Sequence, residues 1–269
     1  MTHEGKVDQW LRRSKSPDRR DFGVEIGAFK TPIPGIRPFY VDRFKEFANE
    51  RCLADYWGDA AALPFHDHSL DYVANSHVLE HTPNPVAALF EWARVTRHGG
   101  MLYMVVPDRR YTFDHTRELT PPVHMMEDFA AGTGVNDGTH ISDYLDRLDW
   151  GRWNPGGTPD QNIAKREELR CAYTTAVAAG QEINIHFHVF EPSNLVELIR
   201  LMNAWPKRTA TLEIVDVAER FPAACPNGFL LVIRVQKTFK TQVAGLISRI
   251  RMKGDPDAAL SAAARPFGK

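Results

Sequence analysis

Cysteine is scarce in this chain of 269 residues, which has only Cys52, Cys171 and Cys225. An odd number of scattered cysteines argues against a disulfide framework and is typical of a reducing compartment. We therefore expect a cytoplasmic protein. No two of these cysteines have the spacing of zinc-ligating pairs, so a cysteine-based metal site is excluded.

Long apolar runs and an excess of one charge are also missing. A window of about 18 apolar residues, which a membrane-spanning helix needs, does not occur, and the polar N-terminus lacks the apolar core of a signal peptide. The formal net charge is −1, whereas nucleic-acid-binding proteins usually carry a basic excess. We expect no transmembrane segment and no nucleic-acid partner.

The segment 58–81 organises what is present. It contains a short apolar run at 70–74 between polar residues, which is typical of an interior strand of a parallel sheet. Residues 86–97 then show apolar side chains at nearly helical spacing. The pair Gly99-Gly100 is predicted to stop that helix, and 101–106 is a second apolar run. Strand, helix and strand predict a βαβ unit and hence a parallel sheet.

Ligands of such sheets bind at the carboxyl ends of the strands. Ser76, His77 and His81 follow the first predicted strand, and Asp108 follows the second. These side chains are therefore candidates for a binding site.

The same stretch resembles the class I S-adenosylmethionine-dependent methyltransferases, especially their type-11 group. That group's pattern of Gly-Asp-Ala, Leu-Pro-Phe, Leu-Asp and Leu-x-His occurs in order at 58–60, 63–65, 70–71 and 79–81. The resemblance covers roughly residues 23–108. It implies an α/β fold with a Rossmann-like, seven-stranded, mostly parallel sheet whose last strand is antiparallel, and S-adenosylmethionine as the cofactor.

The resemblance also implies cofactor contacts near the first strand. Glu25 and Gly27 match the acidic residue and the first glycine of the family motif Asp/Glu-x-Gly-x-Gly-x-Gly, but Phe29 and Thr31 replace the other two glycines. Prolines 32, 34 and 38 then exclude an ordinary crossover helix. We expect an extended loop in its place, a form that is similar to one type-11 subgroup.

Further contacts are implied at the next strand ends. Asp42 matches the residue that holds the ribose hydroxyls, because a carboxylate can accept two hydrogen bonds; the alternative is that it caps a helix at 43–50. Asp59 matches the residue that accepts from the adenine amino group, and Ala60 the residue whose N–H donates to the ring. His77 lies at the end of the fourth strand, where family members line the sulfonium side of the cofactor, and His81 matches the histidine of Leu-x-His. Ser76, His77 and His81 are thus candidate cofactor contacts, with structural hydrogen bonds as the alternative for the histidines.

The family pattern ends at Pro107, and a long polar insertion follows. An insertion of this size tends to be functional. Helices are predicted at 125–131, 141–148, 163–179 and 194–203, a loop at 150–157, and strands at 211–217 and 229–237. The predicted organisation is a polar arm (1–21), a methyltransferase core (22–109 and 186–240), an inserted helical substrate cap (110–185) and a tail (241–269) with a weakly amphipathic helix.

Methyl transfer to a hydroxyl needs a base near the methyl group. His140, His186 and His188 are the candidates, since histidine titrates near neutrality. Our leading interpretation includes no metal; a divalent-metal site on the His186-x-His188 pair, joined by His140 or His124, and structural hydrogen bonds are the alternatives. Asp108, Arg109 and Tyr111 are candidates for binding the acceptor, or else for helix capping and ion pairs.

The resemblance, together with the polar and aromatic-containing cap, thus implies methylation of the oxygen of a small polar acceptor, such as a sugar or glycan hydroxyl, on which Trp150, Trp153 and Tyr111 could stack. A nicotinamide-dependent oxidoreductase is the second hypothesis, although Gly-x-Gly-x-x-Gly and Tyr-x-x-x-Lys are absent. A non-catalytic protein of the same fold is the third. The expected partner is a small molecule or glycan, and the oligomeric state, including a homodimer, stays open.

Overall fold

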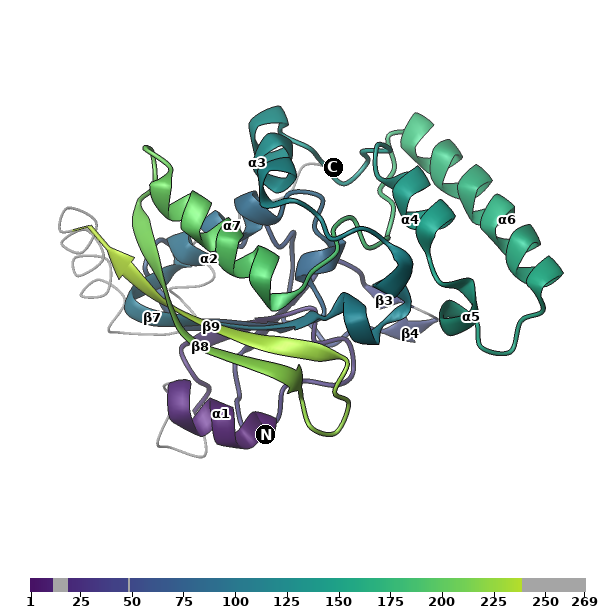
Figure 1. The fold of residues 1–269 in the computed structure, drawn as a ribbon. Coiled ribbons are helices and arrows are strands. Elements are labelled where there is room, and N and C mark those ends of the chain that lie inside the picture. Colours follow the sequence, from purple (N-terminus) through teal and green to yellow (C-terminus); the bar gives the residue numbers. More distant parts are fainter. Residues whose placement is uncertain (12–18, 48, 239–269) are drawn as a thin grey trace.

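The computed structural model describes residues 1–11, 19–47 and 49–238. A seven-stranded sheet with the order β5-β2-β1-β6-β7-β9-β8 forms its centre (Figure 1). The strands β5, β2, β1, β6 and β7 are parallel, and β9 runs antiparallel to both of its neighbours. The predicted fold class is therefore confirmed. The strands are β1 (Gly23–Ile26), β2 (Phe39–Asp42), β5 (Tyr56–Trp57), β6 (Leu70–Ser76), β7 (Thr96–Pro107), β8 (Ala210–Phe221) and β9 (Gly228–Lys237).

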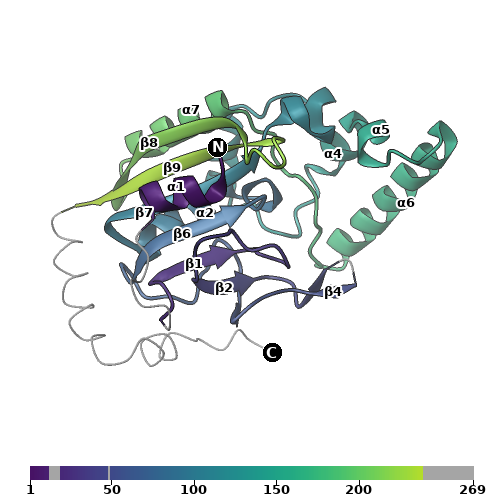
Figure 2. The same cartoon turned by 90° about the horizontal axis from the view of Figure 1, so that it is seen from below.

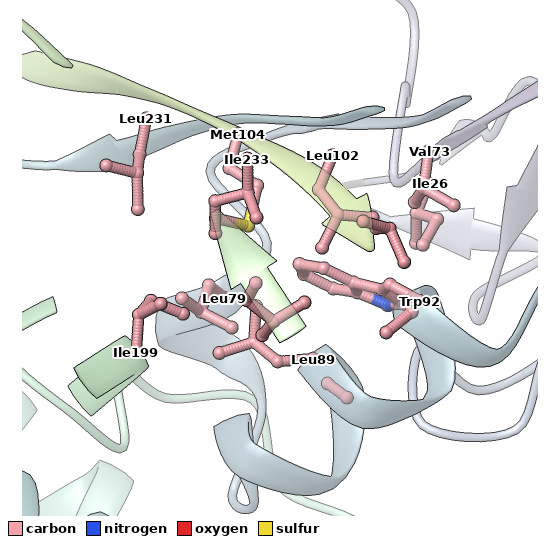
Figure 3. Packing of buried hydrophobic residues seen from close by; sticks show 14 of the residues in the cluster. Ile26, Val73, Leu79, Leu89, Trp92, Leu102, Met104, Ile199, Leu231 and Ile233 are labelled. Carbon is pink, nitrogen blue, oxygen red and sulfur yellow. The ribbon is translucent and has the colours of Figure 1, made fainter. Parts of the chain in front are cut away.

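One face of the sheet packs against helices α2 (Pro85–Val95) and α7 (Pro192–Ala204). Alternate residues of a strand point to the same face, and Val73, Leu102 and Met104 accordingly lie in this layer with Trp92 of α2 (Figure 3). The Trp92 ring is fully buried, and its Nε1 donates to the carbonyl of Ala60 at 2.8 Å. The core thereby fixes the loop that follows β5.

The opposite face is covered differently. Helix α1 (His3–Trp10) places Val7 on it, and the proline-containing loop after β1 adds Ile33 and Ile36 (Figure 2). No helix lies between β1 and β2, as the prolines predicted. The start of the expected polar arm is thus a packed helix, because Val7 is buried and Lys6 pairs with Asp216. The predicted tail helix lies outside the described residues.

One local expectation and one of the alternatives were wrong. Helix α2 ends at Val95, where the N–H of Thr96 donates to the carbonyl of Trp92, and the pair Gly99-Gly100 lies inside β7 rather than after the helix. A Cβ on Gly100 would lie 2.7 Å from the carbonyl oxygen of Asp71, so the glycine permits close strand pairing. No helix follows Asp42 either; the short antiparallel strands β3 (Glu46–Phe47) and β4 (Glu50–Arg51) stand there.

The inserted segment carries α3 (Pro122–Ala131), α4 (Ile141–Arg147), α5 (Trp150–Trp153) and α6 (Pro159–Ala178). The described residues also form short 3-10 helices at η1 (Leu79–His81), η2 (Arg109–Tyr111) and η3 (Phe113–Thr116). Helices α4, α5 and α6 lie on the same side of the molecule as the separate β3-β4 hairpin, whereas α3 lies near α2 and α7 (Figures 1 and 2). The predicted loop at 150 begins with one helical turn, which Asp149 caps. Within the described ranges, no helix combines the length and the apolar character needed to cross a membrane.

Candidate active site

A cavity of about 470 Å³ lies where β1, β2, β5 and β6 end. Its walls come from the loops after these strands and from two parts of the insertion, at 133–135 and 183–184. A volume of this order suits a cofactor or a small ligand. Six of the predicted cofactor residues line it: Gly27, Asp42, Asp59, Ala60, His77 and His81.

Gly27 and Phe29 form the turn after β1. Gly27 has a φ of +67°, and a Cβ there would lie 2.6 Å from Cγ2 of Val78. Only glycine fits this position without strain. Phe29, which replaces the second motif glycine, also has a positive φ of 49°. The backbone thus keeps a left-handed conformation even where the glycine is missing.

Asp42 is the last residue of β2 and is buried. Burial raises the pKa of its carboxyl group, although backbone N–H groups and the thiol of Cys52 oppose this rise. Its Oδ1 accepts a hydrogen bond from the N–H of Phe44 at 2.9 Å. Since no helix begins here, the helix-capping alternative is wrong: the side chain closes a turn and faces the cavity.

Asp59 lies in the loop after β5 and lines the cavity. Its Oδ1 accepts from the N–H of Ala61 at 2.7 Å, and its Oδ2 lies 3.0 Å from Nη1 of Arg43. Arg43 also pairs with Glu182 of the insertion. One arginine therefore joins the two strand-end loops to the cap beside the cavity.

Sequence reasoning missed an aromatic wall. Phe29, Phe44 and Phe47 line the cavity, and Phe47 packs edge-on to Phe29 with 5.8 Å between the ring centroids. The β3-β4 hairpin positions the last of these rings. The sequence signal was ambiguous because phenylalanines three residues apart also suit a helix.

Two histidines that line the cavity, His77 and His81, flank the buried carboxylate of Glu80. Glu80 is fully buried, and its Oε1 lies 3.5 Å from Nδ1 of His77 and 3.8 Å from Nε2 of His81. Burial disfavours the charge on His77, but Glu80 outweighs it and raises the pKa of His77. Burial lowers the pKa of His81 to about 4. His77 also has a φ of 56°, a strained conformation that is common at functional sites.

Glu25 and Ser76 do not line the cavity. Glu25 is buried beneath it, where its Oε1 accepts from the N–H of Ile33 at 2.9 Å, and burial raises its pKa to about 7. It therefore anchors the proline-containing loop. Ser76 ends β6 and pairs with Val105 of β7.

The candidate bases are separated by the fold. Nδ1 of His186 lies 2.6 Å from Oδ2 of Asp114, whose other oxygen accepts from the buried Arg117. Burial alone would raise the pKa of Asp114, but these two partners lower it. The His186 ring packs edge-on against His81, which lines the cavity. His186 thus stands one layer behind the cavity wall.

His140 and His188 lie elsewhere, in a cluster with His124 and Asp128. Nε2 of His188 is 2.9 Å from Oδ2 of Asp128, and the Nε2 atoms of His124 and His140 are 3.1 Å apart. These side chains do not line the cavity. The two histidines of the His186-x-His188 pair therefore contact different carboxylates, Asp114 and Asp128.

The expected acceptor-binding residues have structural contacts. Asp108 caps η2 and pairs with Arg110, Arg109 pairs with Glu191, and Tyr111 lies under Arg220 with 4.1 Å between the guanidinium carbon and the ring centroid. Trp150 and Trp153 pack in the core of the insertion. None of these five side chains lines the cavity, so the structure favours their capping, ion-pair and packing roles.

Comparison with known proteins agrees with this arrangement. Residues 39–104, which span β2 to β7, match the family model of the methyltransferase domain, type 11. No curated protein matches. Among solved structures, the chain is similar to an S-adenosylmethionine-dependent methyltransferase of Methanosarcina mazei, with 15% identity, 88% of this chain and 100% of that chain covered, and a TM-score of 0.47. It is also similar to phosphoethanolamine N-methyltransferase 1 of Haemonchus contortus in complex with phosphoethanolamine and S-adenosylhomocysteine, with 11% identity, 98% and 46% covered, and a TM-score of 0.45.

The family match covers β2, β5 and β6, three of the four strands at whose ends the cavity lies, and the sheet is mostly parallel with an antiparallel last strand, as predicted. Residues 39–104 are therefore similar to a type-11 methyltransferase domain.

Proposed function

We propose that this domain binds S-adenosylmethionine in the cavity and methylates a hydroxyl group of a small polar acceptor, such as a sugar or glycan. The observation that carries the proposal is the position of Asp42 and Asp59. These carboxylates follow different strands, yet both line one cavity together with His77.

The residues present fit an adenosine moiety. Asp42 would hold the ribose hydroxyls, and the aromatic wall of Phe29, Phe44 and Phe47 offers an apolar surface for adenine. Oδ1 of Asp59 accepts from the N–H of Ala61, and Oδ2 pairs with Arg43. Since a carboxylate oxygen has two lone pairs, an acceptor position is left for the adenine amino group. Gly27 lets the backbone of the first turn approach the ligand.

The geometry favours His77 as the general base. It lines the cavity, and the buried carboxylate of Glu80 raises its pKa, which favours the protonated form that it reaches after taking a proton. His81 is a weaker candidate because its pKa is about 4. Glu80 would stabilise the proton that His77 takes from the acceptor hydroxyl. His186 contributes as a positioning residue behind His81.

The cofactor supplies a methyl group on a sulfonium, and transfer breaks the carbon–sulfur bond while a carbon–oxygen bond forms. The chain's own part is to align the hydroxyl, remove its proton and exclude water; such positioning supplies much of the rate. The buried Glu80 and the insertion at 133–135 and 183–184 give the cavity the enclosed wall that this requires.

Calorimetry with S-adenosylhomocysteine tests the cofactor site, and a screen of sugars and glycans with isotopically labelled S-adenosylmethionine tests the acceptor. Submillimolar binding and label transfer to an oxygen are expected. Absence of S-adenosylhomocysteine binding would overturn the site, whereas binding with label transfer to nitrogen or carbon alone would overturn only the acceptor class.

A further inference from the structure

Four potential metal ligands converge on one point outside the cavity, three of them from the insertion and one from the segment that follows it. They are His124 and Asp128 on α3, His140 at the start of α4, and His188 in the segment before α7. Each offers one ligand atom, and these atoms all lie within 4.8 Å of one another. His124 and Asp128 are four residues apart on one helix, so both face the same side.

The distances between the ligand atoms suit a tetrahedrally coordinated ion. Bonds of about 2.0–2.1 Å in a tetrahedral zinc site place neighbouring ligand atoms ~3.3 Å apart. Oδ2 of Asp128 lies 2.9 Å from Nε2 of His188, 3.4 Å from Nε2 of His124 and 3.6 Å from Nε2 of His140. The Nε2 atoms of His124 and His140 are 3.1 Å apart. These edges all fall within a few tenths of an ångström of the tetrahedral value.

The surrounding residues orient two of the ligands. The hydroxyl of Thr139 donates to Asp137, and its oxygen lies 3.0 Å from Nδ1 of His140. His140 can therefore donate from Nδ1, which leaves the lone pair of Nε2 directed into the cluster. Thr133 donates to Oδ1 of Asp128 at 2.9 Å and leaves Oδ2 for the shared point. Partners of this kind accompany metal ligands in proteins.

Burial also fits a structural ion. His140, His188 and Asp128 are buried, whereas the side chain of His124 is 44% exposed and gives access from solvent. Without an ion, the facing Nε2 atoms of His124 and His140 require that one ring donates and the other accepts. A cation would use both lone pairs at once.

We infer that His124, Asp128, His140 and His188 bind one divalent transition-metal ion, with zinc as the best fit. Three imidazole nitrogens and one carboxylate oxygen are typical zinc ligands, whereas calcium and magnesium prefer oxygen alone. Four protein ligands complete a tetrahedral shell, so the ion is structural. It joins α3, the start of α4 and the segment before α7.

The site also shapes the cavity wall. Thr133, which donates to Asp128, lines the cavity with its neighbours Gly134 and Val135. Asn84, another lining residue, donates to the backbone carbonyl of Asp128 at 3.3 Å. The ion thus stabilises the part of the insertion that encloses the ligand, independently of which acceptor is methylated.

The experiment measures zinc content and Co²⁺ binding of the full-length protein after chelation, reloading and dialysis. We expect one tightly bound ion per chain and the visible absorption of tetrahedral Co²⁺. In His124→Ala, whose half-exposed side chain can be removed with the least damage to packing, stoichiometric binding should be lost. Thr139→Val, which removes an orienting partner, should weaken Zn²⁺ binding by about 10–100-fold.

His66→Ala is the matched control, because His66 is exposed and lies in the loop before β6. It should bind zinc as the wild type does. Thermal unfolding adds a second measurement: a chelator should lower the Tm of the wild type and of His66→Ala, but not of folded His124→Ala. Equal zinc content in His124→Ala and the wild type, no retained zinc in the wild type, or an octahedral Co²⁺ spectrum would each overturn the inference.

Discussion

The Nδ1 atom of His77 lies 3.5 Å from Oε1 of Glu80, a carboxylate that is fully buried behind the cavity wall. Within the described residues, neither carboxylate oxygen of Glu80 accepts a hydrogen bond. The adjacent histidines are therefore its main charge partners, and this explains why the pKa of Glu80 is lowered in spite of burial, and why that of His77 is raised.

This pair predicts the pH dependence of the reaction. A base must be neutral to accept a proton, so kcat/KM should rise with pH and level off above the raised pKa of His77. Glu80→Gln removes the negative charge and should move the rise to lower pH. His77→Ala should lower kcat by about 10²–10⁴-fold.

The control for both variants is the Kd of S-adenosylhomocysteine, which should stay within about tenfold of the wild type, since one tenfold step is ~1.4 kcal/mol. A pH profile that does not move in Glu80→Gln would contradict the role of this pair. So would a His77→Ala enzyme of normal kcat.

The strand ends could be predicted from sequence because their signals are local. Apolar runs predicted β6 and β7, and the prolines at 32, 34 and 38 predicted that no crossover helix follows β1. Asp42 and Asp59 could be placed from the family pattern, and both line the cavity. Parallel pairing then brings residues that are distant in sequence to one edge.

The partners of the histidines could not be predicted, because they depend on contacts between distant segments. His186 and His188 are two residues apart, yet their carboxylate partners are Asp114 and Asp128, which lie in different parts of the insertion. The aromatic wall was missed for a related reason. Phe44 and Phe47 have a spacing that suits a helix, but tertiary structure places them in and before a short hairpin.

Removing either candidate cofactor carboxylate should weaken binding. Asp42→Ala and Asp59→Ala each leave polar groups of the ligand without a partner, which costs about 1–3 kcal/mol and raises the Kd of S-adenosylhomocysteine by ~5–150-fold. Calorimetry measures this. Asp160→Ala, on the exposed start of α6, is the matched control and should bind as the wild type does. Unchanged affinity in both cavity variants would remove the site assignment.

Glu25 should make stability depend on pH. Burial raises its pKa from 4.5 to about 7, so its stabilising contribution is complete below 4.5 and is lost as the pH rises through about 7. The free energy of unfolding of Glu25→Gln, which cannot ionise, should rise relative to the wild type over this range. The relative gain is at most about 3 kcal/mol, at ~1.4 kcal/mol per pKa unit.

Urea unfolding across this pH range measures the difference. Glu118→Gln, at an exposed position of the insertion, is the control and should show a difference that does not vary with pH. A constant difference between Glu25→Gln and the wild type would mean that Glu25 ionises as freely in the folded protein as in the unfolded chain.

Gly27 allows backbone strain to be separated from a steric clash. Gly27 and Gly132 have nearly equal φ angles of +67° and +70°, but a Cβ would lie 2.6 Å from Val78 at Gly27 and would have no neighbour within 4 Å at Gly132. Gly132→Ala should cost about 1–2 kcal/mol of stability from the left-handed conformation alone. Gly27→Ala should cost more, and it should weaken S-adenosylhomocysteine binding because the clash moves the turn beside the cavity.

Unfolding free energies and calorimetry of both variants test this prediction. The double variant Gly27→Ala/Val78→Ala should recover part of the lost stability, since the two side chains are in contact. Equal costs at the two glycines would show that Val78 yields freely and that Gly27 does not fix the turn.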